Sequence, residues 1–459
     1  MFELNRLKFA AATIAFPLML VAGGATQAWG DVPANAPQTL SPLDPNSIVW
    51  DMNQEISALL TTRTLDPEFA AKGIPLGQGS PFRLYTNLGL STSFDDNVYK
   101  VAPGVGPGPQ SDFFFTESPT FVLDYLTGDL HLDAYADSTS NEYAKFSGVN
   151  NTEYDFGLKG IYVISRAVQL SANVSYSQDA EPLSSPNDVG FQARPTLYND
   201  FNGNAVLKVQ PNRLGFTVGF NTDTDTYQST PLIGGGPNFD NSDRNDTTYK
   251  GFVEGDYDFS PGYESFVRAT YNSDQYQQYF DRTGTHRSST EDQFDAGVKL
   301  LLSNLIRGQI YVGYLDDHFD THQANPLKDI TGVDFGASVQ WFPTELLTVD
   351  LAASRTITDT VLAGASGGDD RNVSLNADYE VTRRLHLTFN AAYDDTAYEG
   401  SVAPSNLSVD TTSVGLGGKW YIMHYVQATV AYTYSTRSSN AALFRYNDNL
   451  VTVGLNLQI

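Results

Sequence analysis

The chain has 459 residues and no cysteine, and its 53 acidic and 27 basic residues give a formal net charge of −26. This charge argues against a nucleic-acid partner, because proteins bind polyanions through Lys and Arg, and the lack of cysteine excludes disulfides, zinc ribbons and thiol nucleophiles. With 26 Tyr, 27 Phe, 38 Gly and a mean hydropathy of −0.28, the composition is typical of a transmembrane β-barrel, whose strands alternate apolar and polar residues.

The first 30 residues have the layout of a secretory signal peptide. Arg6 and Lys8 precede an apolar run over 9–22, and small residues follow. The run has about 14 residues, fewer than the roughly 20 that a spanning helix needs, so an uncleaved anchor is the weaker alternative. We predict a signal peptide over 1–28 with cleavage after Ala28, or alternatively after Gly30, and a final location in the outer membrane of a Gram-negative bacterium.

Residues 29–80 are predicted to form a periplasmic N-terminal linker. The part over 31–47 is rich in Pro, Asn and Ala, whereas Ile48, Met52 and Ile56 lie at helical spacing. A short amphipathic helix over 47–60 would be either a terminal stub on the periplasmic rim or a small plug or partner-docking helix. A folded periplasmic domain is not expected, since only about 50 residues separate the cleavage site from the first strand.

From residue 81 to 459 the sequence predicts an outer-membrane barrel built from period-two strands. In one example, Tyr249, Val253 and Tyr257 alternate with Lys250 and Glu254 before a turn at 260–262. Such alternation gives a strand one apolar face and one polar face. The fold class is therefore all-β, a transmembrane antiparallel up-and-down barrel of about 18 strands, an even number as in bacterial barrels, starting near residues 82, 113, 130, 154, 168, 201, 214, 249, 263, 294, 306, 333, 347, 373, 385, 414, 426 and 451.

The connections alternate between short turns and long polar loops, which is typical of periplasmic turns and extracellular loops. Short turns lie near 126, 166, 212, 261, 304, 343, 383 and 423, and long loops over 93–111, 178–198, 221–247, 272–290, 315–330, 355–371, 394–410 and 435–447. About 18 strands with both ends in the periplasm require nine outer loops, and the sequence reveals eight.

Aromatic residues cluster at the strand ends, where the membrane meets water. Such positions favour rings with a polar tip, and two girdles are predicted. They consist of Tyr176, Phe220, Tyr271, Tyr314, Tyr393 and Tyr434 on one side, and of Tyr125, Phe259, Trp341 and Trp420 on the other. A soluble β-sandwich or propeller explains neither these girdles nor the unequal rims. The last strand resembles the C-terminal assembly signal of outer-membrane proteins, with Ile459 where Phe or Trp is usual.

Several motifs together resemble the putative β-barrel porin 2 family. They are Thr62–Phe69, Gly73–Gly77, Phe82–Tyr85, Phe94–Tyr99, Ser111–Phe113, Pro119 and Ile164–Arg166. The resemblance implies an association with exopolysaccharide synthesis machinery, in which some members are thought to supply the outer-membrane pore for the polymer. The segment Phe94–Tyr99 also has a local explanation, since Asp and Asn readily form turns that end a strand, and we do not interpret it as a binding site.

The polar face of the strands is expected to line a water-filled lumen, which a barrel of about 18 strands is wide enough to leave. The candidate pore residues are Asp133, Asp155, Lys159, Lys208, Lys250, Phe252, Glu254, Asp256, Asp258, Glu264, Phe266, Arg268, Asp295, Lys299, Arg307, Tyr311, Asp350, Asp378 and Glu380. Their acidic excess favours cations and neutral solutes over anions. The inward Phe252, Phe266 and Tyr311 either stack on sugar rings or fill the wall.

The leading functional hypothesis is a passive exit channel for a secreted exopolysaccharide that is neutral or weakly charged. Its expected partners are outer-membrane lipid and lipopolysaccharide, the glycan cargo, and periplasmic and inner-membrane polysaccharide export proteins. The alternative is a general or sugar-selective diffusion porin for small solutes. A plugged active transporter is excluded, because the N-terminal segment is too short for a plug domain.

Enzymatic chemistry is not expected. None of the six His residues accompanies a serine nucleophile in a recognisable motif, and between His318 and His322 the residue Phe319 stands where a zinc-protease motif needs Glu. Loop acids such as Asp223 and Asp225 have carboxylates that calcium accepts, but the ligand order of an EF-hand is absent. The sequence therefore assigns no catalytic residue, no cofactor and no metal.

Overall fold

The computed structural model describes residues 73–106, 108–187, 193–232, 237–302, 305–319, 326–400 and 407–459. The predicted signal peptide, the predicted helix over 47–60 and the segment Thr62–Phe69 lie outside these ranges. Within the described ranges, no helix has the length and hydropathy needed to cross a membrane.

Most described residues belong to β-strands. The elements are β1 (Ile74–Pro75), β2 (Phe82–Asp95), β3 (Asp112–Leu126), β4 (Leu130–Tyr143), η2 (Ser147–Val149), β5 (Asn151–Ser165), β6 (Val168–Glu181), β7 (Thr196–Val209), β8 (Leu214–Tyr227), η3 (Ser242–Arg244), β9 (Asp246–Ser260), β10 (Tyr263–Tyr276), β11 (Ser289–Leu302), β12 (Ile306–Phe319), β13 (Ile330–Thr344), β14 (Leu347–Thr358), β15 (Ala365–Thr382), β16 (Leu385–Gly400), β17 (Ser408–Met423), β18 (Val426–Ser439), η4 (Ala442–Phe444) and β19 (Tyr446–Gln458).

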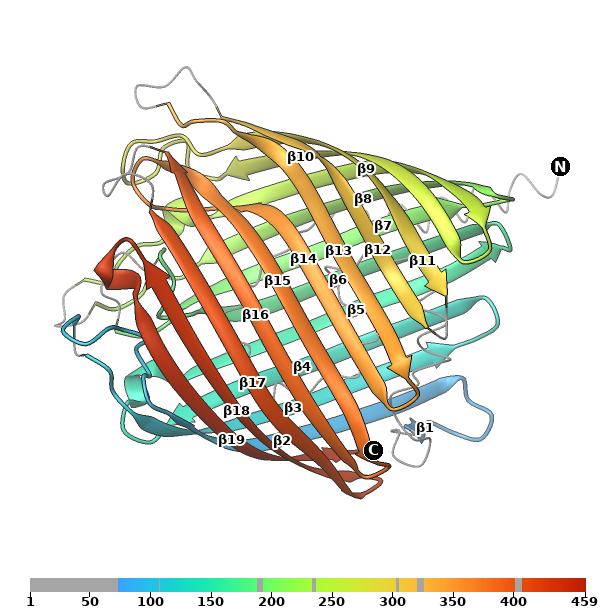
Figure 1. The fold of residues 1–459 in the computed structure, drawn as a ribbon, viewed down its shortest axis with the longest axis horizontal. Coiled ribbons are helices and arrows are strands. Elements are labelled where there is room, and N and C mark those ends of the chain that lie inside the picture. The colour runs from blue at the N-terminus through green and yellow to red at the C-terminus, as the bar shows by residue number, and fades with distance from the viewer. Residues whose placement is uncertain are drawn as a thin grey trace.

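The strands close into one antiparallel barrel (Figure 1). Each strand from β2 to β18 pairs with the next, and β19 returns to pair with β2, so these 18 strands form the wall and the two-residue β1 is an addition to it. The prediction of an antiparallel barrel of about 18 strands is confirmed. The outer loop missing from the sequence prediction is the short connection over 144–150, which contains η2.

The outer ends of the strands differ from the prediction. The segments over 355–371 and 394–410 were expected to be long loops, yet β15 begins at Ala365 and β16 ends at Gly400, which leaves only 359–364 as the loop between β14 and β15. The strand ladder continues through residues that are polar on both faces, such as Asp369 and Asp370. Polar residues on both faces give no period-two signal, which is why the sequence pattern ended these strands too early.

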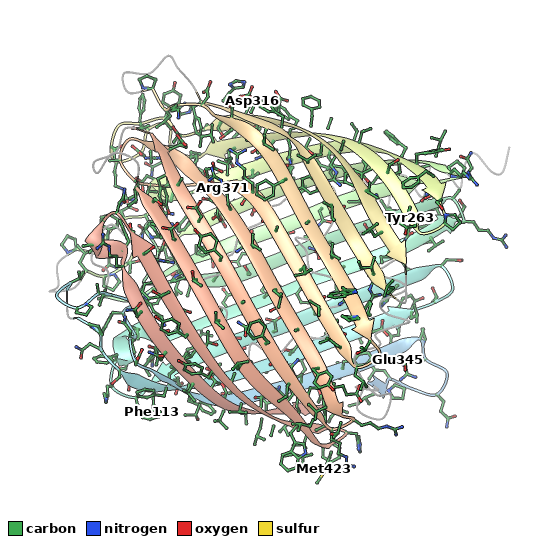
Figure 2. The ribbon with its side chains drawn as sticks, in the orientation of Figure 1. Phe113, Tyr263, Asp316, Glu345, Arg371 and Met423 are labelled. Carbon is green, nitrogen blue, oxygen red and sulfur yellow. The ribbon has the colours of Figure 1, made fainter. Side chains whose placement is uncertain are left out.

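The wall has an apolar outer face and a polar inner face. On β9, Val253 is 47% exposed on the outside, whereas the neighbouring Glu254 is 3% exposed. Figure 2 labels Phe113 and Tyr263, which lie on the outer surface near opposite rims of the barrel. The alternation that the sequence predicts is therefore the division between a face suited to lipid and an aqueous interior.

A two-residue turn joins β9 and β10 at the rim with the short connections. Pro261 and Gly262 occupy it, and Gly262 has a φ of +81°. Proline at the first central position followed by a residue with positive φ is the pattern of a type II turn, which glycine enters without strain.

The seam between β19 and β2 is held by the segment after β2. The Asp96 carboxylate accepts hydrogen bonds from the backbone amide (2.8 Å) and the side chain (2.7 Å) of Asn449. The Asn97 side chain donates to the Asn447 carbonyl at 2.8 Å. The Asp-Asp-Asn motif thus closes the barrel at its outer end as well as ending the first strand.

Beyond the C-terminal end of β19, β1 pairs with the part of β2 that β19 leaves unpaired. Ile459 and Thr86 exchange two backbone hydrogen bonds, and beyond them Ile74 and Pro75 pair with Leu84 and Arg83. The edge of β2 that β19 does not reach is covered in this way, which reduces the exposure of unpaired strand groups.

We expect Asp96→Ala to weaken the seam by about 1–3 kcal/mol, because it leaves the partly buried donors of Asn449 without their carboxylate. The measurement is the midpoint of thermal unfolding in detergent, monitored by the difference in gel mobility between the folded and the unfolded barrel. Asp129→Ala, in an exposed turn at the opposite rim, is the control. Equal midpoints for the two variants would contradict the assigned role of Asp96.

Candidate functional site

The candidate pore residues lie on the inner wall of the barrel. Each alternates along its strand with residues of the apolar outer face, so the structure places all of the following side chains toward the interior: Asp133, Asp155, Lys159, Lys208, Lys250, Phe252, Glu254, Asp256, Asp258, Glu264, Phe266, Arg268, Asp295, Lys299, Arg307, Tyr311, Asp350, Asp378 and Glu380. Contact of any of them with a passing solute remains a prediction.

Many of these charges neutralise one another. The Lys299 Nζ lies 2.7 Å from Glu254 Oε1, 2.8 Å from Asp256 Oδ1 and 2.9 Å from Glu264 Oε1. Arg268 donates two further hydrogen bonds to Glu254, at 2.6 and 2.8 Å. All five side chains are buried. We call these five residues the Lys299 network; it is an internal ion network of the wall between β9, β10 and β11.

The inward aromatic residues surround Arg268. Its guanidinium carbon lies 4.9 Å from the ring centre of Phe266, 5.8 Å from that of Tyr311 and 5.9 Å from that of Phe252. Cations are attracted to the faces of such rings. The three rings predicted either to stack on sugars or to fill the wall are therefore engaged with an arginine of the wall itself.

Glycines in the adjacent strands let these rings lie flat against the wall. Phe252 is paired with Gly219 of β8, and Tyr311 with Gly336 of β13. A Cβ at either glycine would overlap the ring opposite it. The rings of Phe252 and Tyr311 therefore lie over the glycines of the neighbouring strands.

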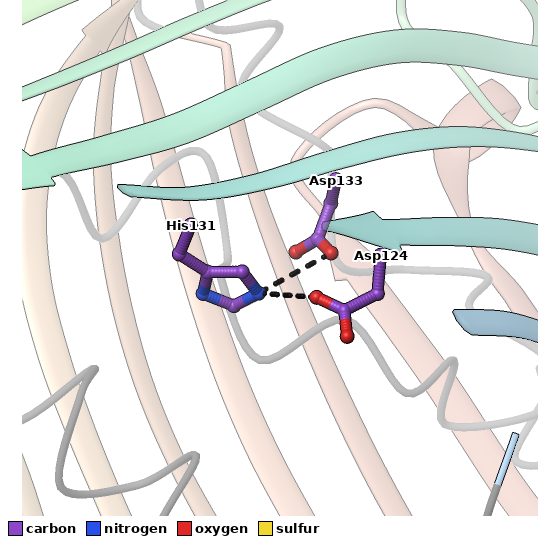
Figure 3. Close-up of side chains that lie close together, drawn as sticks. All are labelled: Asp124, His131 and Asp133. Carbon is purple, nitrogen blue, oxygen red and sulfur yellow. Dashed lines mark hydrogen bonds and ion pairs between the residues drawn. The ribbon is translucent and has the colours of Figure 1, made fainter. Parts of the chain in front are cut away.

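A histidine and two carboxylates meet on β3 and β4 (Figure 3). The His131 Nε2 on β4 lies 2.8 Å from Asp124 Oδ1 of β3 and 3.4 Å from Asp133 Oδ1 of β4. An imidazolium between two carboxylates accounts for this geometry. The group also has donor atoms within 4.8 Å of one another, as in a metal site, but its contacts are satisfied as ion pairs.

Three neighbouring outer loops are joined to one another. Arg244 in η3 forms a bidentate pair with Glu181, at 2.7 and 2.9 Å, and packs 3.9 Å over the ring of Tyr227. Arg282 pairs with Asp243, and the Ala193 amide donates to the Pro231 carbonyl at 2.8 Å. These contacts join the described parts of the three loops, which are 182–187 with 193–195, 228–232 with 237–245, and 277–288, into one connected layer.

Arg287 links this layer to the loop over 359–364. It is 3% exposed, pairs with Asp281 at 2.7 Å and donates to the carbonyls of Ala365 (3.0 Å) and Leu362 (3.2 Å). Burial alone would raise the pKa of Asp281, but hydrogen bonds from Thr283 and Thr285 and the charge of Arg287 hold that pKa below its usual value. Asp281 therefore remains ionised and fixes the arginine.

The layer also reaches across the barrel. Asn187, in the loop between β6 and β7, accepts hydrogen bonds at its Oδ1 from the Thr360 hydroxyl (2.9 Å) and the Val361 amide (3.2 Å), and its Nδ2 donates to the Asp359 carbonyl at 3.4 Å. The loop that carries Thr360 joins β14 and β15, which lie on the far side of the wall from β6 and β7 in the strand order. We call this contact the cross-bore bridge.

Acidic side chains line the wall beside the bridge. They are Asp200 on β7, Asp223 and Asp225 on β8, Asp246 on β9, Asp274 on β10 and Asp359 in the loop. We call these six residues the acidic strip. Asp223 and Asp225 were interpreted as loop acids from the sequence, but they lie in β8, because the strand continues beyond its apolar segment.

No pattern in the sequence indicates the cross-bore bridge. Asn187, Thr360 and Val361 are ordinary loop residues, and contacts between residues 172 to 174 positions apart leave no periodic pattern. Part of the acidic strip could have been recognised in the sequence, because Asp223 and Asp225 have the period-two spacing of residues on one face of a strand. His318, which was placed in a loop, lies on β12 and contacts Asp329 at 3.1 Å, while His322 lies outside the described residues.

A closed antiparallel barrel with an apolar exterior, a polar interior and loops folded across its mouth is an outer-membrane porin-like β-barrel. The chain matches the model of the family described as putative beta-barrel porin 2 over residues 66–459. It therefore belongs to this family, as its motifs predicted. The family and the fold are those of a channel rather than an enzyme.

Solved structures that are similar to this chain include three proteins of Pseudomonas aeruginosa. OccK9 (OpdG) is 13% identical with a TM-score of 0.44 and covers 82% of this chain and 98% of its own. The outer membrane protein opdK is 12% identical, with a TM-score of 0.43 and coverage of 82% and 99%. OccK3 (OpdO) is 13% identical, with a TM-score of 0.41 and coverage of 82% and 96%. No curated protein matches the chain.

Proposed function

We propose that the protein is a diffusion porin for small polar solutes that prefers cations and neutral molecules to anions. The observation that carries the proposal is the cross-bore bridge, in which Asn187 hydrogen-bonds to Asp359, Thr360 and Val361 from the opposite side of the wall. A connection through the mouth divides the bore, so it favours solutes small enough to pass beside it over a continuous polymer.

The charge of the mouth supports the preference for cations. The acidic strip lies beside the bridge, whereas Arg244 and Arg287 are already paired with Glu181 and Asp281. Charges in the Lys299 network largely cancel, whereas the acidic strip gathers carboxylates beside the bridge. Acidic side chains at a constriction attract cations and repel anions.

The test of ion preference is the zero-current potential of single channels in a planar bilayer with a KCl gradient. We expect a sign that corresponds to K⁺ crossing more readily than Cl⁻, because the acidic strip raises the local concentration of cations. Asp225→Asn together with Asp246→Asn should move the potential toward zero. A potential of the opposite sign in the unaltered protein would contradict the proposal.

Export of an exopolysaccharide is the second candidate, favoured by the family motifs from Phe82 to Arg166. In that case the cross-bore bridge would have to open for the polymer, and periplasmic and inner-membrane export proteins would supply the driving force. Deletion of the gene separates the two candidates. Normal secreted polysaccharide with slower uptake of small solutes supports the diffusion porin, and loss of secreted polysaccharide supports export.

A further inference from the structure

Carboxylates of the acidic strip oppose one another directly across neighbouring strands. Asp200 of β7 is the register partner of Asp225 of β8, and Asn202 is the partner of Asp223. Asp225 is in turn the partner of Asp246 of β9. Like charges directly opposite in a sheet destabilise it, so this arrangement requires a counter-charge or a bound proton.

Three of these carboxylates form a compact group. Oxygen atoms of Asp200, Asp223 and Asp225 lie within 4.8 Å of one another. Asp200 is 9% exposed and Asp223 is 5% exposed. One carboxylate oxygen of each of the three residues is buried and has no hydrogen-bond partner among the described residues. A buried carboxylate oxygen without a partner is costly, and this compact group contains three of them.

Arg244, in the loop that follows β8, is held in contacts with other residues. Its guanidinium forms the bidentate pair with Glu181 and packs against the Tyr227 ring. Asn202, on the same face of β7, uses its Oδ1 to accept a hydrogen bond from Asn173 at 3.3 Å. The group therefore offers oxygen donors with a charge of −3 when ionised.

We propose that Asp200, Asp223 and Asp225 bind a divalent cation of the calcium class. Hard cations take carboxylate oxygens as ligands, and Ca²⁺ accepts a flexible set of such oxygens together with water. The group lies three to five residues beyond the girdle residue Phe220 on a strand that runs toward the outer rim, so it is on the extracellular side, where calcium from the medium reaches it. The site is independent of which solute the barrel passes.

A cation at this position would also act on its neighbours. Asp246, Asp274 and Asp359 form a second group of carboxylates within 4.8 Å of one another, and Asp359 belongs to the loop of the cross-bore bridge. Neutralising Asp225 reduces the repulsion that Asp246 experiences across the strand pair. Calcium at the first group should therefore stabilise the folded outer end of the barrel.

The experiment is a calcium titration of the chelator-treated barrel in detergent, in which calorimetry measures the binding. We expect saturable binding by the unaltered protein and a rise in its thermal midpoint with Ca²⁺. Asp223→Asn should reduce the number of bound Ca²⁺ ions per chain by one, or weaken binding at least tenfold, because it removes a ligand charge. Asp350→Asn, which alters a carboxylate elsewhere on the inner wall that bonds to Gln340, is the matched control and should bind as the unaltered protein does.

A spectroscopic measurement on the unaltered protein tests cation binding even if the Asp223→Asn variant fails to fold. Tyr198 and Tyr227, whose ring centres are 5.1 Å apart, lie two residues from Asp200 and Asp225 on the same inner face. Terbium bound at the carboxylates should show tyrosine-sensitised emission that Ca²⁺ displaces. No saturable calcium binding, no such emission, or an Asp223→Asn variant that binds Ca²⁺ as before would each overturn the proposal.

Discussion

Asn187→Ala is expected to increase the single-channel conductance and to admit larger sugars. The substitution removes all three side-chain hydrogen bonds of the cross-bore bridge. At about 1 kcal/mol for each bond, the closed bridge loses about 3 kcal/mol, which changes the ratio of closed to open bridge roughly a hundredfold. The measurements are conductance in planar bilayers and the swelling rate of proteoliposomes in sugars of increasing size.

Asn238→Ala is the control for this prediction, because Asn238 is an exposed asparagine of the loop over 228–245 and lies outside the bridge. It should leave conductance and the size limit unchanged. If Asn187→Ala has the same conductance and size limit as the unaltered protein, the bridge does not limit passage, and the main argument for small solutes fails.

Lys299→Met is expected to destabilise the barrel strongly. Lys299 is the shared partner of Glu254, Asp256 and Glu264, all of them buried. Removal of one partner from a buried ion group leaves uncompensated charge and costs about 3–5 kcal/mol. The expected result is a large fall in the denaturant concentration at which the barrel unfolds, measured by tryptophan fluorescence in detergent.

Lys419→Met provides the comparison. Lys419 contacts one partly exposed carboxylate, Asp378, at 3.2 Å, and loss of such a pair costs about 1 kcal/mol or less. Adding Glu264→Gln to Lys299→Met should restore part of the lost stability, because it removes one of the stranded charges. Equal effects of the two lysine substitutions would show that the Lys299 network does not stabilise the wall as a unit.

The membrane-spanning part of the fold could be predicted from the sequence because lipid on the outside and water on the inside require apolar and polar residues to alternate along each strand. On β9, for example, Tyr249, Val253 and Tyr257 must face lipid while Glu254 and Asp256 face the interior, and this difference is visible in the residues themselves. Outside the membrane both faces of a strand meet water, so the constraint disappears. The outer parts of β15 and β16 and the connection over 144–150 were missed for that reason.

The site could be predicted only in part. The period-two pattern predicts that Glu254, Arg268 and Lys299 face the interior of the barrel. Their mutual ion pairs depend on the register between strands, which this pattern does not specify. Recognition of the acidic strip needs the alignment of Asp200 with Asp225 across β7 and β8. The cross-bore bridge depends on the path of two loops and is visible only in three dimensions.

The pairing of β19 with β2 has a consequence for biogenesis. Hydrogen bonds at this seam join residues 350 and 353 positions apart, so the wall cannot be completed before the last strand has been synthesised and delivered. Until then the nascent sheet carries two unpaired edges, which are prone to mispairing and aggregation. The hydrogen bonds from Asn449 to Asp96 and from Asn97 to Asn447 give the last strand specific polar partners at the outer end of β2. Once they form, they set the register in which the rest of β19 pairs with β2 toward Ile459.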